Sequence, residues 1–393
     1  MDNFEFYSPT EFVFGREREN ETGVYVKKYG GSRVLIHYGS GSAVKSGLLD
    51  RVKKSLEAQG IFYTELGGVK PNPRDTLIYE GIEICRRDNI DFILSVGGGS
   101  CIDSAKGIAA GVPYDGDFWD FYEDKAEITK AVPIGTVLTI AAAGSEGSAA
   151  SVVTQEKTKL KRDAAADILR PRFSILNPEL TCTLPPYQTA CGATDIMAHV
   201  FERYFTNTSD VEITDRLCEA VLLTMVKEVP EVIADSGNYQ ARANIMWAGT
   251  VAHNDIVGVG RSQDWNSHNI EHELSGLYDC AHGAGLAVIM PSWMEFVMNH
   301  NVMRFAQAAV RIWGCEMDFE APEKTALEGI RRFRRFLHDI GMPINLAELG
   351  AREEDIPALV KNMGLNGGRT GGFVQLSEED ITEIYNIAAK ASV

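Results

Sequence analysis

The chain has 393 residues, and 38 basic against 55 acidic side chains give it a formal net charge of −17. Its 45% hydrophobic and 24% charged residues are typical of a globular protein, and the acidic balance excludes an electrostatic footprint for nucleic acid. We find no basic segment followed by an apolar stretch at the start, no apolar run long enough to cross a bilayer, and no CxxC pair among the seven cysteines. We therefore expect a reduced, cytoplasmic protein without a membrane partner.

Up to about Asn177, short apolar runs bounded by glycine or turn residues alternate with helical stretches, one of which covers residues 74–88. This alternation predicts a parallel β-sheet with helices on both faces. The expected strands lie at 34–39, 62–66, 92–99, 131–139 and 173–176.

The two ends of the chain differ from this pattern. Residues 4–15 predict a short hairpin ahead of the first strand–helix unit, and a terminal ribbon of this kind can pair with a second subunit. After the LPP at 184–186, hydrophobic residues repeat with a helical period, which predicts an all-helical second half. We expect an α/β domain with a Rossmann-like parallel sheet over 1–182 and an all-α domain over 183–393.

The segment SVGGGSCIDSAKG at 95–107 follows an apolar run and opens a helix at about Ser100. Consecutive glycines let a backbone approach a ligand closely, and a helix N-terminus offers amide groups and a positive dipole, so a pyrophosphate is the natural ligand. A tight turn without a ligand is the alternative. Lys106 is expected to pair with Asp103 or to reach an anion. The candidate phosphate-binding residues are Gly97, Gly98, Gly99, Ser100 and Asp103.

The first expected strand of this unit ends in Gly39, Ser40, Gly41 and Ser42. An NAD site usually offers a carboxylate here to the adenosine ribose, whereas this segment offers only glycines and hydroxyls, with Lys45 nearby. This composition favours NADP(H) over NAD(H). The alternative is that Ser42 only caps the following helix.

Grouped histidines and an aspartate predict a metal site. Asp195 and His199 are spaced i, i+4, which places both side chains on one face of a helix. His268 and His272 have the same spacing, and His282 follows after a turn that contains glycine. A set of three histidines and one aspartate suits Fe(II) or Zn(II) with one position open to substrate. Spacing alone does not decide whether His272 or His282 completes the set.

Taken together, the motifs resemble the iron-containing (group III) alcohol dehydrogenase family, in particular its NADP-dependent butanol dehydrogenase branch. The resemblance extends over nearly the whole chain. The motifs that carry it are GGGSxxDxxK at 97–106, GSE at 144–146, LPP at 184–186, DxxxHxxE at 195–202 and HxxxHxxxxxxxxxH at 268–282.

The resemblance implies roles for individual residues. His272 lies near the nicotinamide and the reacting oxygen and is the candidate catalytic proton relay. Thr139 begins a nucleotide-contacting loop, and Lys161 contacts the ribose or its 2′-phosphate, although its basic surroundings also fit a solvated side chain. Ala143 stands where the family more often has a threonine hydroxyl. The implied metal ligands are Asp195, His199, His268 and His282.

The implied function is that of an NADP(H)-dependent alcohol dehydrogenase or aldehyde reductase for small aliphatic substrates. Fe(II), or Zn(II) in the same site, is the expected metal, and a homodimer through the N-terminal strands is the expected assembly. One alternative is a lyase resembling dehydroquinate synthase, which the lack of Lys and Arg in residues 264–285 disfavours. A polyol oxidoreductase resembling glycerol dehydrogenase is the second, and a non-catalytic nucleotide or metal sensor is the least favoured.

Overall fold

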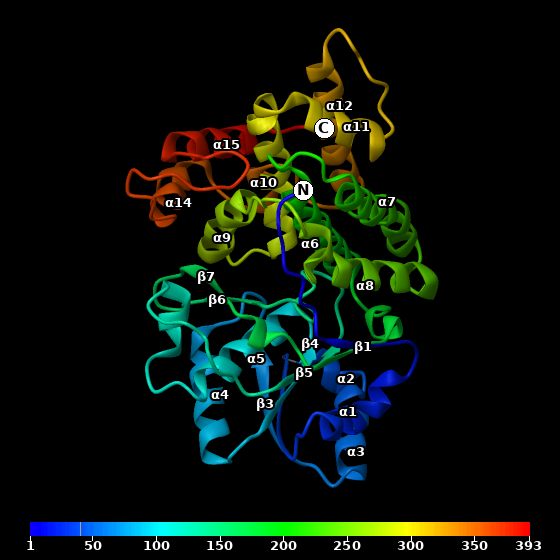
Figure 1. Ribbon diagram of the computed structural model, residues 1–393, viewed down its shortest axis with the longest axis vertical. Helices are drawn as coiled ribbons and strands as arrows, with labels where there is room; N and C mark the ends of the chain where they lie inside the picture. Colours follow the sequence, from blue (N-terminus) through cyan, green and yellow to red (C-terminus); the bar gives the residue numbers. More distant parts are fainter. Residues whose placement is uncertain (40) are drawn as a thin grey trace. The chain divides into compact units, whose positions relative to one another are not determined.

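The computed structural model describes residues 1–39 and 41–393, and the chain divides into two compact units (Figure 1). The sheet unit consists of Tyr7–Leu184 and Gly237–Asn254, and the helical unit consists of Met1–Phe6, Pro185–Ser236 and Asp255–Val393. Both units are therefore discontinuous in sequence. A division at Cys182 accounts neither for the opening residues nor for the helix within Gly237–Asn254.

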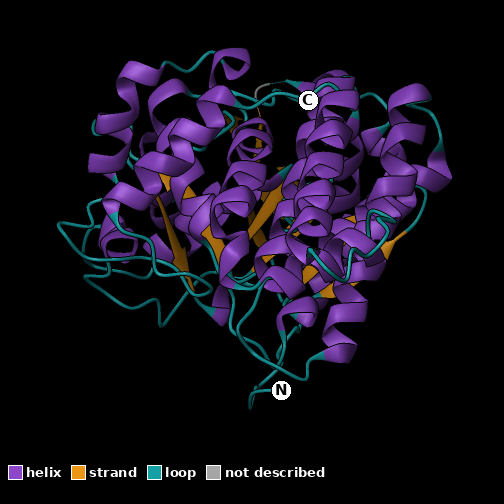
Figure 2. Ribbon diagram, turned by 90° about the horizontal axis from the view of Figure 1, so that it is seen from above, coloured by secondary structure: helices purple, strands orange, loops and turns teal. Residues whose placement is uncertain are grey.

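The sheet unit is built on six parallel strands in the order β1-β8-β5-β4-β2-β3 (orange in Figure 2). All five expected strands are confirmed. Every residue of the central strands is buried, because both faces of a parallel sheet are covered, and this is why these strands are continuous apolar runs in the sequence. The strands are β1 (Glu11–Phe14), β2 (Arg33–Gly39), β3 (Phe62–Val69), β4 (Phe92–Gly97), β5 (Ile134–Leu138) and β8 (Phe173–Leu176).

Helices pack on both faces of this sheet. Leu35 belongs to one apolar layer together with Ile78, whereas its neighbour Ile36 belongs to the opposite layer together with Val52. The alternation of neighbouring strand residues between two cores confirms the expected α/β architecture. The helices of this unit are α1 (Thr22–Lys28), α2 (Ser42–Lys45), α3 (Leu48–Ala58), α4 (Asp75–Arg87), α5 (Gly99–Gly111) and α8 (Tyr239–His253).

The expected hairpin at 4–15 is wrong. Within this segment only Glu11–Phe14 is a strand, and it pairs in parallel with β8 at the edge of the sheet. The opening residues find their partners in the helical unit instead: the Met1 amino group donates to the Ser209 carbonyl, and the Asp2 amide donates to the Gly260 carbonyl. These partners are distant in sequence, so the local pattern of residues 4–15 could not indicate them.

A two-stranded antiparallel ribbon, β6 (Ala150–Thr154) with β7 (Lys161–Ala165), is an addition that the sequence pattern did not predict. The polar run before β7 resembles a solvated loop, yet Lys161 is only 4% exposed. The solvated alternative for Lys161 is therefore wrong.

The helical unit confirms the expected all-α second half, since all the strands that the structure describes end by Leu176. α6 is buried along most of its length and forms the centre of this unit. Among the described helices, none combines the length and apolar character needed to cross a membrane. The helices of this unit are α6 (Pro186–Tyr204), α7 (Glu212–Ala234), α9 (Asn266–Tyr278), α10 (His282–Val297), α11 (Val302–Arg311), α12 (Pro322–Asp339), α13 (Leu346–Leu349), α14 (Ile356–Asn362) and α15 (Glu378–Lys390).

Candidate metal centre and nucleotide-binding loops

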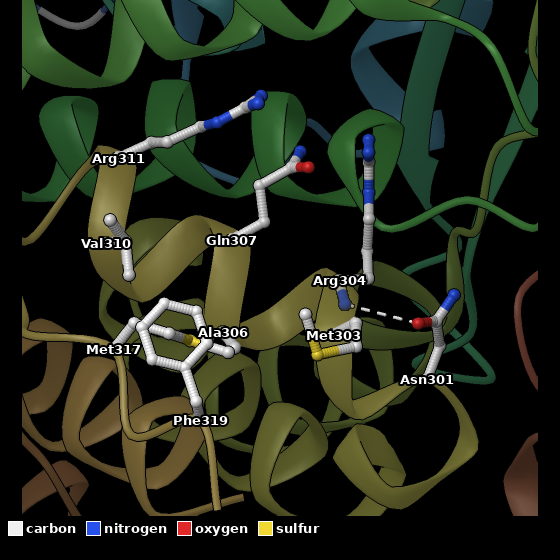
Figure 3. Close-up of a pocket in the computed structure, with 9 residues that line it drawn as sticks. All are labelled: Asn301, Met303, Arg304, Ala306, Gln307, Val310, Arg311, Met317 and Phe319. Atoms are coloured by element: carbon white, nitrogen blue, oxygen red, sulfur yellow. Dashed lines mark hydrogen bonds between the residues drawn. The ribbon is translucent and has the colours of Figure 1, made fainter. Parts of the chain in front are cut away.

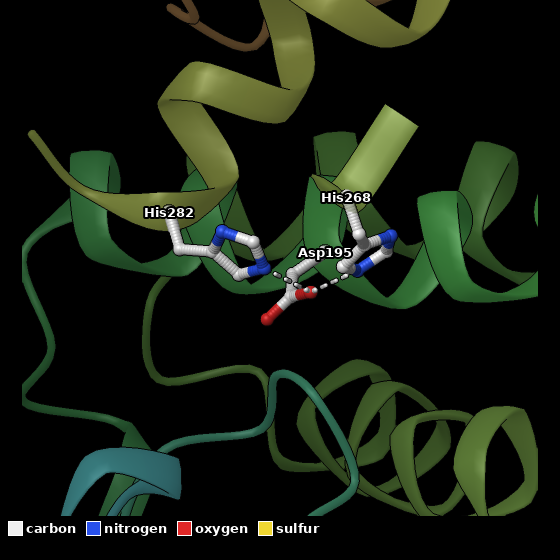
Figure 4. Close-up of side chains that lie close together, drawn as sticks. All are labelled: Asp195, His268 and His282. Carbon is white, nitrogen blue, oxygen red and sulfur yellow. Dashed lines mark ion pairs between the residues drawn. The ribbon is translucent and has the colours of Figure 1, made fainter. Parts of the chain in front are cut away.

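Three helices of the helical unit bring the four candidate metal ligands together. α6 carries Asp195 and His199, α9 carries His268, and α10 begins at His282. Figure 4 shows the rings of His268 and His282 directed at the Asp195 carboxylate. Asp195 Oδ1 lies 3.5 Å from His199 Nδ1 and 3.8 Å from Nε2 of both His268 and His282.

The spacing of these atoms fits a shared cation. Asp195 Oδ1 and His268 Nε2 are buried and have no hydrogen-bond partner among the described residues, and two such atoms are costly to bury unsatisfied. Ligand atoms about 2.1 Å from one ion at tetrahedral angles lie roughly 3.4 Å apart, close to the separations found here. Imidazole and carboxylate donors suit Fe(II) and Zn(II). The residues present therefore fit a divalent metal ion.

The geometry also bears on the choice between His272 and His282. Ligand atoms of Asp195, His268 and His282 all lie within 4.8 Å of one another, and a second group of the same compactness joins His272 to Glu271 and His282. His272 is buried, with its ring centroid 5.6 Å from that of His282. This arrangement favours His282 in the metal set and leaves His272 beside it.

Two glutamates contact the outer nitrogens of the candidate ligands. Glu202 Oε2 lies 2.5 Å from His268 Nδ1, and the His282 Nδ1 hydrogen-bonds with Glu271 Oε2. Burial alone would lower the pKa of His268, but the carboxylates of Glu202 and Asp195 outweigh it and raise the pKa to about 9. Sequence analysis assigned no role to either glutamate. The sequence could have indicated Glu202, because this residue lies two helical turns after Asp195 and therefore on the same face of the helix. No comparable spacing indicates Glu271.

The glycine loop between β4 and α5 has the shape expected of a phosphate site. A Cβ on Gly97 would lie 2.3 Å from Cys101 Sγ, so glycine is needed there for α5 to pack against β4. A Cβ on Gly99 would meet nothing within 4 Å, and α5 begins at this residue. Gly98 is the N-cap, and Ser100 lies in the first turn. Open space beside the N-terminus of a helix supports the predicted pyrophosphate site.

Lys106 interacts with Asp103 through its charge, as one of the two predictions for it expected, but its ammonium group donates to main-chain carbonyls and not to an anion. Lys106 is fully buried and donates to the carbonyl oxygens of Ser145, Ser148 and Ala150 at 2.8, 2.9 and 2.7 Å. Asp103 instead accepts hydrogen bonds from the Ser145 hydroxyl at 2.6 Å and the Val152 amide at 3.3 Å. Burial lowers the pKa of Lys106 to about 8, partly opposed by Asp103 and Glu146. Lys106 therefore organises the segment after the GSE motif rather than an anion.

The other predicted nucleotide residues lie around the same loop. The Thr139 amide donates to the Gly97 carbonyl at 3.0 Å, which places Thr139 directly beside the glycine run. Lys161 is the first residue of β7. Burial raises the pKa of Asp103 overall, and the charges of Lys106 and Lys161 partly oppose this rise. The Thr250 hydroxyl of α8 donates to Glu146 at 2.6 Å, which explains why α8 belongs to the sheet unit.

The segment after β2 approaches the same helix. A Cβ on Gly39 would lie 3.7 Å from Cys101 Sγ, the atom that also faces Gly97. Ser40 lies outside the described residues. Gly41 is the N-cap of α2 and Ser42 its first residue, and no side chain caps this helix, so the capping role considered for Ser42 is wrong. Lys45 Cε lies 3.9 Å from a Cβ built on Gly41.

A separate pocket of about 430 Å³ lies along α11 (Figure 3). Met303, Val310 and Phe319 give it apolar, exposed walls. Its arginines are engaged elsewhere, since Arg304 pairs with Asp215 and Arg311 pairs with Glu219. The pocket therefore lacks an uncommitted guanidinium for an anionic ligand, and it contains none of the candidate site residues.

Comparison with known proteins identifies the family. The profile of the iron-containing alcohol dehydrogenases matches residues 9–178, and the C-terminal profile of the Fe-containing alcohol dehydrogenase family matches residues 189–389. The chain belongs to the iron-containing alcohol dehydrogenase family, which confirms the resemblance drawn from the motifs.

The similarity extends over whole chains. The protein is 40% identical to NADH-dependent butanol dehydrogenase A of Clostridium acetobutylicum, over 98% of this chain and 99% of that one. It is 35% identical to the NADPH-dependent aldehyde reductase YqhD of Escherichia coli, over 97% of each chain. The crystal structure of NADH-dependent butanol dehydrogenase A from Thermotoga maritima has 41% identity and a TM-score of 0.96, over 99% of both chains. The protein is thus an oxidoreductase of the alcohol dehydrogenase class.

Proposed function

We propose that this protein is a metal-dependent alcohol dehydrogenase or aldehyde reductase that acts on small aliphatic alcohols and aldehydes of the butanol type. The observation that carries the proposal is the convergence of three imidazoles on the buried Asp195 carboxylate in a chain of this family. We propose Asp195, His199, His268 and His282 as the ligands and Fe(II) as the metal. Zn(II), which such donors also bind, is the expected competitor.

Asp195 and His272 have different roles in the proposed reaction. When bound, the metal supplies Lewis acidity to the substrate oxygen, and the nicotinamide supplies or accepts the hydride. The Asp195 carboxylate offsets part of the charge of the cation, and the three imidazoles lie around it. His272 lies beside His282 without joining the Asp195 group, so it is placed to hold or pass a proton at a ring nitrogen.

We further propose NADP(H) as the preferred cofactor. No carboxylate occurs in residues 39–49, where an NAD site usually has one, and the Lys45 side chain extends along Gly41. The similar proteins include both NADH-dependent and NADPH-dependent enzymes, so the cofactor preference must be argued from this chain's own residues. The ratio of kcat/KM for NADPH and NADH measures it, and a clear preference for NADH would overturn this part of the proposal.

The assembly and location follow as proposals of the same kind. β1 is an edge strand, and Phe14 and Trp247 beside it are 39% and 44% exposed with their rings 6.4 Å apart. An unpaired edge with exposed aromatic rings supports a homodimer formed through β1, and sedimentation of wild type and Phe14→Glu tests it. All seven cysteines are free thiols, which supports a reducing, cytoplasmic location.

The deciding experiment is anaerobic turnover of butanal by metal-free protein reconstituted separately with Fe(II) and Zn(II). We expect NADPH oxidation that depends on added metal, with NADH as the weaker donor. Absence of turnover with either metal and either nucleotide, across a panel of aliphatic aldehydes, would overturn the proposed reaction.

A further inference from the structure

Two buried carboxylates of the helical unit have imidazoles as partners. Glu202 on α6 and Glu271 on α9 are both 0% exposed. Burial of an uncompensated carboxylate is strongly unfavourable, so each of these side chains needs donors or cations around it. The ion pairs found for these two glutamates are with His268 and His282, which are both candidate metal ligands.

Glu202 binds the first turn of α9 through two hydrogen bonds and one ion-pair contact. Its Oε1 accepts from the His268 amide at 3.0 Å and from the Ser267 hydroxyl, and its Oε2 faces His268 Nδ1 at 2.5 Å. The His268 amide is one of the first amides of α9, which have no acceptor within their own helix. One carboxylate on α6 thus fixes both the backbone and the ring of His268.

Glu271 on α9 binds the ring of His282, which lies at the start of α10. Its Oε2 accepts from His282 Nδ1, and its Oε1 accepts from the Ser275 hydroxyl one turn further along α9. A Cβ on Gly285 would lie 2.4 Å from Glu271 Oε1, so α10 approaches this carboxylate as closely as only glycine permits. The Glu271 side chain therefore lies between α9 and α10, and its carboxylate contacts the ring of His282.

A carboxylate accepts hydrogen bonds and donates none, so the hydrogen bond to Glu271 requires a proton on His282 Nδ1. The Glu202 carboxylate beside His268 Nδ1 favours a proton on the same nitrogen of that ring. In the neutral ring, which is the form that binds a metal, this tautomer leaves a lone pair on Nε2. Both Nε2 atoms lie 3.8 Å from Asp195 Oδ1. We propose that Glu202 and Glu271 are positioning residues that fix the tautomer and direction of His268 and His282 and thereby set the metal affinity of the centre. The inference rests on the proposed metal site and deepens it.

The test replaces each carboxylate by the amide of the same shape. In Glu202→Gln, the amide oxygen can keep the two hydrogen bonds to Oε1, but the NH₂ group then faces His268 Nδ1 and the charged contact with the ring is lost. Glu271→Gln loses the charge that holds the His282 proton on Nδ1. Changes of such partners lower metal affinity by about 10–100-fold. We expect that loss in each variant of the full-length protein, measured with Zn(II) and Co(II) by competition with a chelator.

Glu273→Gln is the matched control, because Glu273 is also buried on α9 but acts electrostatically on Tyr385. It should bind both metals within about twofold of wild type. A second readout is the tautomer itself: ¹⁵N-histidine NMR of the zinc-loaded wild type should show protonated Nδ1 at His268 and His282, and the corresponding signal should be lost or exchange-broadened in the matching variant.

The outcomes separate the two levels of the proposal. Wild-type affinity in Glu271→Gln and Glu202→Gln overturns the positioning role while the metal centre stands. No binding of either metal by wild type overturns the centre itself. If Glu202→Gln does not fold, as judged by circular dichroism, the affinity and tautomer of Glu271→Gln decide the inference.

Discussion

The nucleotide loops of the sheet unit and the histidine cluster of the helical unit are built in different ways. At the loops, the backbone sets the geometry. Glycines allow α5 to pack closely against β4, and Lys106 binds three main-chain carbonyls of the segment after the GSE motif. In the cluster, side chains from three helices set the geometry, and buried carboxylates orient the rings.

This difference predicts two kinds of mutational effect. Changes at the loops should act on stability and on cofactor affinity, because they disturb backbone geometry. Changes in the cluster should act on metal retention or turnover, because each side chain has a separate chemical task.

Replacement of His268 by Ala should abolish activity and metal content together. The variant removes one proposed ligand and leaves Glu202 without its imidazole partner. Metal analysis after gel filtration and butanal reduction with NADPH measure both quantities. A variant that kept its metal and its activity would show that His268 is not a ligand.

Replacement of His272 by Ala should lower kcat while the metal remains bound. Loss of a proton relay typically costs about 10²–10⁴-fold in rate. Turnover per bound metal ion is therefore the quantity to compare with wild type. Loss of metal in His272→Ala would mean that His272, rather than His282, completes the ligand set.

The contrast also explains what the sequence could predict. Strands β4 and β5 were predictable because parallel strands buried on both faces are continuous apolar runs. The pairing of Asp195 with His199 was predictable because helical spacing places both side chains on one face. Other contacts were not predictable because they join distant parts of the sequence. The hydrogen-bond partners of Lys106 are about 40 residues away, and the partners of residues 1–6 are about 200 residues away or more. Glu271 acts through a ring on another helix, so no local pattern could indicate it.

Replacement of Lys106 by Met should destabilise the protein by about 1–3 kcal/mol, the usual cost of leaving a buried hydrogen-bond acceptor without its donor. Three main-chain carbonyls would lose their donor, and the segment after the GSE motif would lose its anchor. Urea unfolding measures the change, with the exposed Lys130→Met as control. An effect as small as that of the control would contradict the role assigned to Lys106.

Two substitutions in the β4–α5 loop should affect different properties: one should lower the stability of the fold, and the other should weaken NADPH binding. Gly97→Ala places a Cβ 2.3 Å from Cys101 Sγ and should cost about 1–3 kcal/mol by overpacking. Gly99→Ala meets no atom within 4 Å, so it should fold normally yet raise the KM for NADPH by filling the space proposed for the phosphate. Equal stability of both variants, or an unchanged KM in Gly99→Ala, would contradict this division.

The smallest effect is expected at Lys45, and it tests the cofactor preference separately from the fold. Lys45 is exposed at the end of α2, so solvent and salt weaken any contact that it makes with a 2′-phosphate. Lys45→Met should therefore lower kcat/KM for NADPH by roughly threefold to tenfold, leave the value for NADH unchanged, and leave stability unchanged. Lys54→Met, at another exposed lysine of the sheet unit, should alter neither value. Because NADPH and NADH differ only in the 2′-phosphate, an equal loss with both would assign Lys45 to the common part of the nucleotide and remove the charge argument for NADP(H).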